Sequence, residues 1–330
     1  MKREKTFLVM MMVVFLLLLL NVKTWSAEYI MKSAEISREG LSHSLAQKYF
    51  AKRVEEITEG KAKVNVFYGG TLGNERNYCE QLQLGSLDFA KVMATNGTAF
   101  VPIFEVFGMP YLVRSTDHYY KIPDSFAGKI IQDEADKAGF VILAYWDTGL
   151  ENIYNSRRPI TKPEDLKGLK IRTRESPVLI DTVNAMGGSG APLATPEVFT
   201  ALQTKVFDGG VQSSVGFAMV FKYAEICKYY SLTEHALEGT LFMASKKRFD
   251  KLPKEIQNAI RQAGRESMEY MHRQVTPAEE REALDVMNKY GVKLNKVDKE
   301  VFIKSVAPVQ AKYKTKFRGD LIDGIANLIK

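Results

Sequence analysis

The feature that most constrains the fold is an unbroken run of seven apolar residues, Phe140–Trp146, which follows a helical pattern ending at Gly139. A strand without a polar position is expected where both faces of a sheet are covered. Strand and helix patterns alternate through most of the chain after residue 27. A β-α-β-α order indicates a mostly parallel sheet with helices on both faces, so the sequence predicts an α/β protein.

The domain organisation follows from length and from the lack of a linker. A chain of 330 residues allows two domains, at about 100–200 residues each. The second half of the chain alternates strand and helix patterns as the first half does, and no low-complexity segment separates the two halves. Two lobes without a flexible linker suggest that the chain crosses between them more than once. The cleft between such lobes is a natural ligand site.

The N-terminus has the layout of an export signal. Residues 1–5 carry three positive charges, residues 7–20 are fourteen apolar residues, and small residues follow at Ser26 and Ala27. Fourteen helical residues span only about 21 Å, which is short of the roughly 30 Å core of a membrane, so an anchor is the weaker alternative. We expect residues 1–26 to be a signal peptide, cleaved near Ser26 or Ala27, and the protein to be periplasmic.

Charge and cysteine content exclude several classes of protein. The net charge is +7, of which the first 26 residues contribute +3, and the rest is too thinly spread to indicate nucleic-acid binding. The two cysteines, Cys79 and Cys227, exclude a disulfide-rich scaffold, and we expect two buried thiols rather than a disulfide. None of the four histidines lies in an HExxH motif or a Cys/His ligand pair. The sequence therefore predicts neither a metal nor a cofactor.

The sequence also lacks a recognisable catalytic motif. There is no phosphate-binding loop, and the glycines at 69–73 and 187–190 are better explained as turns than as a dinucleotide fingerprint or a nucleophile elbow. An exported α/β protein without a nucleophile and base is expected to be a binding protein rather than an enzyme. A secreted enzyme acting on an anionic substrate is the alternative from another class.

Several segments in collinear order resemble one protein family. They include Glu80–Gly85, Pro110–Leu112, the stretch Pro163–Arg172 (Pro-Glu-Asp-Leu-Lys-Gly-Leu-Lys-Ile-Arg), Pro196–Gln203 and Asp208-Gly209. Together they resemble the solute-binding proteins of tripartite ATP-independent periplasmic (TRAP) transporters, the DctP-like family. Each segment alone is weak, but the series covers essentially the whole chain after residue 27.

The resemblance implies an architecture and a function. The fold would be the two-lobed periplasmic-binding-protein fold (type II-like, Venus flytrap) with a long lobe-spanning helix. Lobe I would contain residues 27–148 and about 237–276, and lobe II would contain 149–236 and about 277–330. The function would be that of a monomer that binds a small organic acid, such as a sugar acid, and delivers it to small and large TRAP permease subunits. A receptor for an ABC importer or a sensor kinase is the alternative within this class.

The resemblance also implies site residues. An arginine at the end of the Leu-Lys-Ile-Arg strand, here Arg172, would pair with the ligand carboxylate, because a guanidinium offers two parallel N–H donors. Gln212 stands where the family often has Asn, and Glu75 lies in a turn that often contacts the ligand. Further residues lie in segments that line the cleft in relatives: Asn96, Trp146, Phe199 and His235.

One departure from the family pattern concerns specificity. Many relatives carry a second arginine where this sequence has Glu151. A glutamate cannot bind a second carboxylate, so the dicarboxylate or sialic-acid specificity of relatives does not transfer. Arg174 is also unusual at its position. We expect it either to pair with Glu151 or to supply a replacement cation.

Overall fold

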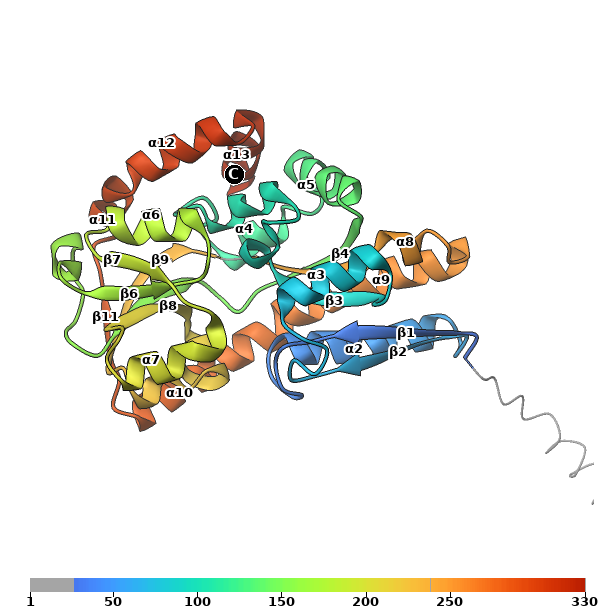
Figure 1. Ribbon diagram of the computed structural model, residues 1–330, viewed down its shortest axis with the longest axis horizontal. Coiled ribbons are helices and arrows are strands. Elements are labelled where there is room, and N and C mark those ends of the chain that lie inside the picture. Colours follow the sequence, from blue (N-terminus) through green and yellow to red (C-terminus); the bar gives the residue numbers. More distant parts are fainter. Residues whose placement is uncertain (1–26, 238, 330) are drawn as a thin grey trace, which may run out of the picture.

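The computed structural model describes residues 27–237 and 239–329, which form two α/β lobes (Figure 1). Each lobe is built on its own sheet, so the predicted two-lobed α/β architecture is confirmed. The first sheet has the strand order β2 (Ala62–Phe67), β1 (Tyr29–Ala34), β3 (Phe89–Met93), β10 (Thr240–Ser245) and β4 (Phe140–Trp146). The second has the order β11 (Lys293–Lys296), β9 (Tyr229–Ala236), β5 (Glu151–Asn155), β8 (Gly209–Ser213), β6 (Lys170–Thr173) and β7 (Ser189–Pro192).

Both sheets are mixed rather than mostly parallel. In the first sheet β1 pairs in parallel with β2 and β3, but β10 runs antiparallel to β3 and β4. In the second sheet β6 pairs in parallel with β7 and β8, but β5 runs antiparallel to β8 and β9. The antiparallel strands β5 and β10 are those that begin just after the chain has crossed from the other lobe, and no βαβ connection determines their direction.

In the part of the chain that the structure describes, twelve segments are α-helical. Those beside the first sheet are α2 (His43–Ile57), α3 (Glu75–Leu84), α4 (Thr116–Tyr120), α5 (Phe126–Lys137), α8 (Lys246–Phe249) and α9 (Lys254–Tyr270). The others are α6 (Pro177–Ala185), α7 (Val198–Gln203), α10 (Thr276–Lys289), α11 (Lys299–Ser305), α12 (Ala307–Lys316) and α13 (Gly319–Ala326). No helix among the described residues is both long and apolar enough to span a membrane.

The core of the first lobe explains the apolar run at 140–146. All seven residues of β4 are buried, and they divide between two apolar clusters. Phe140 and Ile142 lie in the cluster that contains α3 and α5, whereas Trp146 lies in the cluster that contains α2 and α9. The prediction that both faces of this strand are covered is therefore confirmed.

The lobes are joined where β4 passes into β5, where β9 passes into β10, and along a continuous helical segment, 254–289. In this segment α9 passes through a π-helical turn, Met271–Val275, directly into α10. Figure 1 shows α9 beside the first sheet and α10 beside the second, so the predicted long lobe-spanning helix is present. The Thr276 hydroxyl donates to the carbonyl oxygen of Asp147 (3.2 Å), which ties the helix to the β4–β5 connection.

The C-terminal end differs from the expected lobe boundaries. The sequence places 277–330 in the second lobe, and within this range α10, β11, α11 and α12 do contact elements of the second lobe. α13 packs against α5 of the first lobe, and Leu321 and Ile325 belong to its apolar cluster. The amphipathic face of α13 is buried against this neighbour, which a boundary drawn from sequence does not reveal.

A partly buried carboxyl group, that of Glu280, lies at the first crossing. An ideal Cβ built on Gly149 would lie 2.1 Å from Oε1 of Glu280, so the α10 carboxyl group is packed directly against this connection. Burial, together with the charges of Asp147 and Glu234, raises the pKa of Glu280 from 4.5 to about 7. Between these two values the folded protein keeps a proton that the unfolded chain has released, so stability falls as the pH rises through this window.

We therefore expect Glu280→Gln to remove part of the pH dependence of stability. Glutamine stays neutral, so the melting temperature of the variant should exceed that of wild type by a larger margin at pH 8 than at pH 4.5. Thermal unfolding followed by circular dichroism at both pH values measures the difference. Glu282→Gln, which changes an exposed acid on the same helix, is the control. An equal margin at both pH values would contradict the prediction.

Candidate ligand-binding site

Arg172 is a buried cation at the end of β6. Its side chain is only 2% exposed. Nε and Nη2 donate to the carbonyl oxygen of Leu193 (2.9 and 2.7 Å), and Nη2 also donates to Oγ1 of Thr195 (3.1 Å). Among the described residues, neither N–H group of Nη1 has an acceptor. The guanidinium is thus fixed along one edge by neutral oxygens and keeps two donors for another molecule.

Two tyrosines lie close to this guanidinium. The rings of Tyr154 and Tyr223 stack with centroids 5.4 Å apart, and among the described residues neither buried hydroxyl group has a hydrogen-bond partner. Burial raises the pKa of Tyr223 to about 12, and the charge of Arg172 acts in the opposite direction, which shows that the groups are close. A Cβ at Gly210 would lie 2.4 Å from the Tyr154 hydroxyl, so only glycine leaves room for this ring.

Arg174 and Glu151 form a buried ion pair. Nη2 of Arg174 donates to both carboxylate oxygens of Glu151, at 2.7 and 2.8 Å, and the side chains are 6% and 3% exposed. The expectation that these residues could pair is confirmed. Burial lowers the pKa of His235 to about 4, and the charges of Glu151 and Arg174 act on this pKa in opposite directions. The imidazole of His235 is therefore neutral at pH 7. Its Nδ1 lies 2.8 Å from the Thr233 hydroxyl oxygen.

The first lobe contributes a second buried ion pair. Nζ of Lys91, on β3, donates to Oε1 of Glu75 (2.8 Å), and the side chains are 4% and 5% exposed. The amide nitrogen of Asn96 donates to the other carboxylate oxygen of Glu75. Glu35 is also buried. Burial raises the pKa of its carboxyl group, and the charge of Lys91 lowers it.

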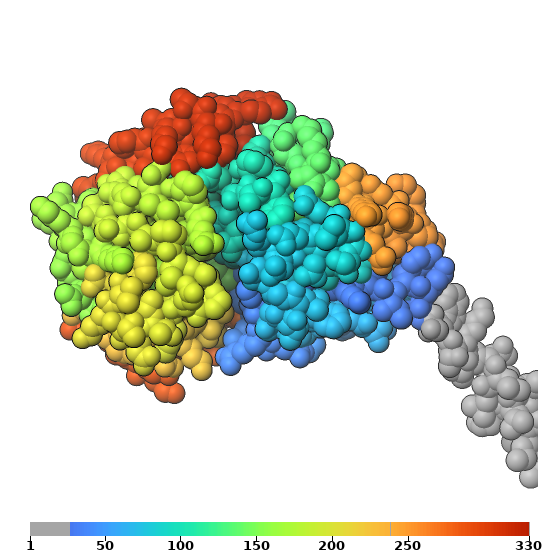
Figure 2. Space-filling model, viewed as in Figure 1, coloured from blue at the N-terminus to red at the C-terminus, as the bar shows by residue number. Residues whose placement is uncertain are grey.

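The two groups of residues influence each other electrostatically across the lobe boundary. Burial lowers the pKa of Lys91, but the charges of Glu75 and Glu35 raise it above its usual value, and the charge of Arg174 is a smaller influence that opposes this rise. This effect requires the two cations to lie near each other, although they belong to different sheets. In the space-filling view the lobes meet along a boundary between the cyan surface of the first and the yellow-green surface of the second (Figure 2).

The other predicted site residues occupy different positions. Gln212 on β8 is buried, and its side-chain oxygen accepts from the amide of Ser213 (3.0 Å). Trp146 lies inside the first-lobe core, stacked on Phe242 at 4.6 Å. Phe199 on α7 is half-buried and packs on the second-lobe apolar cluster. Thus Arg172, Arg174, Glu151 and His235 are gathered in one lobe and Glu75 and Asn96 in the other, whereas Trp146 and Phe199 pack mainly with apolar neighbours.

Sequence reasoning missed several buried polar residues, namely Lys91, Glu35, Tyr154 and Tyr223. Lys91 had a usable signal, because a lysine inside the apolar strand 87–93 must find a partner if the strand is buried. For Glu35, Tyr154 and Tyr223 the sequence contains no such signal. Glu35 follows a strand, and the tyrosines have the composition of ordinary core residues.

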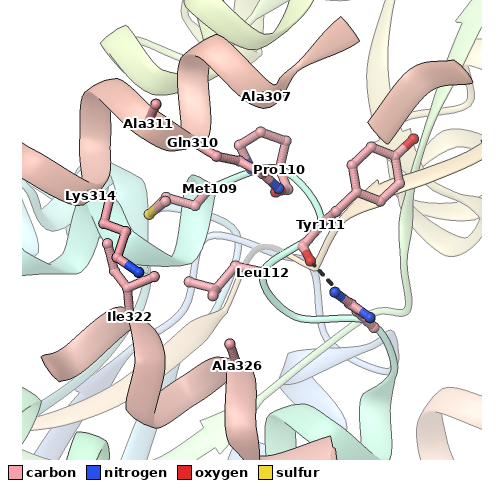
Figure 3. Close-up of a pocket in the computed structure, with 11 residues that line it drawn as sticks. Met109, Pro110, Tyr111, Leu112, Ala307, Gln310, Ala311, Lys314, Ile322 and Ala326 are labelled. Atoms are coloured by element: carbon pink, nitrogen blue, oxygen red, sulfur yellow. Dashed lines mark hydrogen bonds between the residues drawn. The ribbon is translucent and has the colours of Figure 1, made fainter. Parts of the chain in front are cut away.

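A separate cavity of about 300 Å³ lies where the loop 109–114 meets α12 and α13 (Figure 3). Its lining is mainly apolar, and the side chain of Gln310 donates to the carbonyl oxygen of Pro110 (2.9 Å). The cavity contains none of the predicted site residues. Its loop is nevertheless tied to β9, because the amide of Tyr111 donates to the carbonyl oxygen of His235 (2.7 Å).

Two α/β lobes, each with its own mixed sheet and joined by a crossing helix, are the architecture of two-lobed solute-binding proteins. A family model described as bacterial extracellular solute-binding protein, family 7 (DctP), matches residues 33–316. The chain belongs to this family, and its function is that of a TRAP-type solute receptor. The family consists of substrate-binding receptors that lie outside the cytoplasm.

Individual relatives agree with this assignment. The 2,3-diketo-L-gulonate-binding periplasmic protein YiaO of Escherichia coli K12 is 31% identical over 262 residues, which are 79% of each chain. A TRAP periplasmic solute-binding protein from Sulfitobacter sp. NAS-14.1, solved with β-D-galacturonate, is 30% identical with a TM-score of 0.85, covering 90% of this chain and 99% of that one. One from Citrobacter koseri, solved with D-glucuronate, is 34% identical with a TM-score of 0.82, covering 90% and 98%.

Proposed function

We propose that this protein is a receptor for a sugar acid with a single carboxylate, which it binds between its lobes without changing it chemically. The observation that carries the proposal is Arg172, a buried cation with two N–H groups that have no acceptor among the described residues. A buried charge is costly unless it is paired, and a carboxylate matches a guanidinium in charge and geometry. Burial also lowers the pKa of Arg172, and an anionic ligand would offset this effect.

The other charges support one carboxylate rather than two. Arg174 is paired with Glu151, and Lys91 is paired with Glu75, so each of these cations already has an anionic partner. A second ligand carboxylate would have to compete with a buried glutamate for either cation. The relatives named above are known with sugar acids, which is consistent with this chemistry.

The delivery step follows from the family, whose receptors work with membrane permease subunits. We propose that the partners here are the small and large subunits of a TRAP permease, and that the protein acts as a monomer in the periplasm. The signal peptide with cleavage near Ser26 or Ala27 lies outside the described residues and remains part of this proposal.

A thermal-shift panel tests the proposed function. The panel contains D-glucuronate, D-galacturonate, D-erythronate and 2,3-diketo-L-gulonate, with D-glucose as a control that lacks a carboxylate. A ligand at 100 times its Kd stabilises the folded state by about 2.7 kcal/mol, so at least one acid should raise the melting temperature clearly. The acid should be recovered chemically unchanged. No shift with any acid, or an equal shift with D-glucose, would contradict the proposal.

A further inference from the structure

We propose that Lys91 is a specificity-determining residue of the first lobe, and that it recognises, together with Glu35, hydroxyl groups at the end of the ligand distant from its carboxylate. This inference rests on the proposed function and assigns the half of the site that Arg172 does not explain. Lys91 lies on β3, between β1 and β10, at the centre of the first sheet. Lysine is almost never fully buried unless it is paired.

The ammonium group of Lys91 is only partly satisfied by the protein. It has three N–H donors, and among the described residues its acceptor is Oε1 of Glu75. Both oxygens of Glu75 are already used, one by Lys91 and one by Asn96. Two donors of a side chain that is 4% exposed therefore remain for another molecule.

Several acceptors and donors around Lys91 are also without a partner. Oε1 of Glu35 accepts from the amide of Ser37 (2.8 Å), but Oε2 is buried without a partner among the described residues. The same holds for Nε2 of His43 and the hydroxyl group of Tyr78. In the parallel pairing of β1 with β3, Ala34 lies opposite Ala90, so the next residues, Glu35 and Lys91, follow side by side. The charge of Lys91 also acts on the pKa values of Glu35 and His43.

Such a cluster matches hydroxyl groups better than a second carboxylate. Buried polar atoms in proteins nearly always have hydrogen-bond partners. Several unpartnered polar atoms close together therefore indicate a ligand that is rich in hydrogen-bonding groups. A hydroxyl group can accept from Lys91 and donate to Glu35 at the same time, whereas a carboxylate can only accept. A carboxylate would also be repelled by Glu75 and Glu35, which lie beside the ammonium.

The position of Lys91 relative to the second lobe gives the ligand its orientation. The charge of Arg174 acts on the pKa of Lys91 across the lobe boundary. Arg174 directly follows β6, two residues after Arg172, and residues two apart on a strand lie on the same face of the sheet. A sugar acid whose carboxylate lies at Arg172 would therefore direct its hydroxyl groups toward Lys91 and join the two lobes.

Calorimetric titration tests this inference with the panel acid that stabilises wild type most. Lys91→Met should weaken binding by about 30-fold or more, as expected for the loss of a buried, charged hydrogen-bond donor. Because Lys91→Met leaves Glu75 without its partner, the double variant Lys91→Met/Glu75→Gln is measured as well and should show a similar loss. Lys32→Met, an exposed lysine on the neighbouring strand β1, is the matched control and should bind as wild type does.

The possible outcomes separate the two proposals. If no acid of the panel stabilises wild type, the proposed function fails and this inference fails with it. If wild type binds, but both Lys91 variants bind within about threefold of it, the receptor function stands and Lys91 has only a structural role. D-Glucarate, which carries a second carboxylate, should bind wild type at least about 30-fold more weakly than D-glucuronate. Equal binding of the two would overturn the assignment of hydroxyl groups to Lys91.

Discussion

Replacing Arg172 with alanine is expected to weaken binding of the best sugar acid by about 30-fold to several-thousand-fold, which corresponds to ~2–5 kcal/mol. The reason is the burial of the guanidinium, since a carboxylate bound there would be left without its counter-charge. Arg172→Lys should also be impaired. A lysine ammonium cannot hold the carbonyl oxygen of Leu193 along one planar edge and still present the two donors of Nη1.

The control for this prediction is another arginine of the second lobe. Arg157 is exposed, and its Nε lies 3.4 Å from a carboxylate oxygen of Asp208, so Arg157→Ala should bind as wild type does. Calorimetric titration of each variant gives the affinity, and its melting temperature without ligand shows that it is folded. An Arg172→Ala protein that is folded and binds within about threefold of wild type would rule out the assignment of the ligand carboxylate to Arg172.

The position of Arg172 could be predicted from sequence because its strand has a local pattern. The segment Leu169–Thr173 has the pattern of a strand after a short helix, and β6 occupies 170–173, whereas the role of Arg172 was inferred from the family resemblance. Lys91 was missed for the opposite reason. Its nearest partner, Glu75, lies 16 residues away on a helix, and Arg174 lies in the other lobe. Pairings of this kind depend on how the sheets and lobes assemble, which no local period encodes.

The elements of the fold also differ in whether a local sequence pattern or long-range pairing determines them. The helices of the first half follow clear periodicities, and β4 is an unbroken apolar run. By contrast, the sequence indicated no strand at β9 or β10. These strands are neighbours in the chain and belong to different sheets, so their pairing is entirely long-range. The pattern Thr276–Glu279 suggests a capping box at which the helix kinks or restarts, and α10 does begin at Thr276 after the π-helical turn Met271–Val275, but without a side-chain capping bond. The Glu279 carboxylate accepts instead from the amide of Ser42, in the loop before α2.

The largest effect on stability is expected from breaking the ion pair between Arg174 and Glu151. Arg174→Ala should lower the free energy of unfolding by about 3–5 kcal/mol, because it leaves a buried carboxylate without its counter-charge. The Glu151 side chain is 3% exposed, so water cannot easily replace the lost partner. Urea unfolding followed by circular dichroism measures the change.

A paired replacement shows whether the cost comes from the isolated charge or from the loss of packing. Glu151→Leu/Arg174→Met removes both charges together, and exchanging a buried ion pair for apolar residues is often neutral or stabilising. We therefore expect the double variant to recover most of the stability that Arg174→Ala loses. Arg273→Ala breaks an exposed pair with Glu269 and should cost less than about 1 kcal/mol. If the double variant were as unstable as Arg174→Ala, packing around these side chains rather than their charge balance would account for the loss.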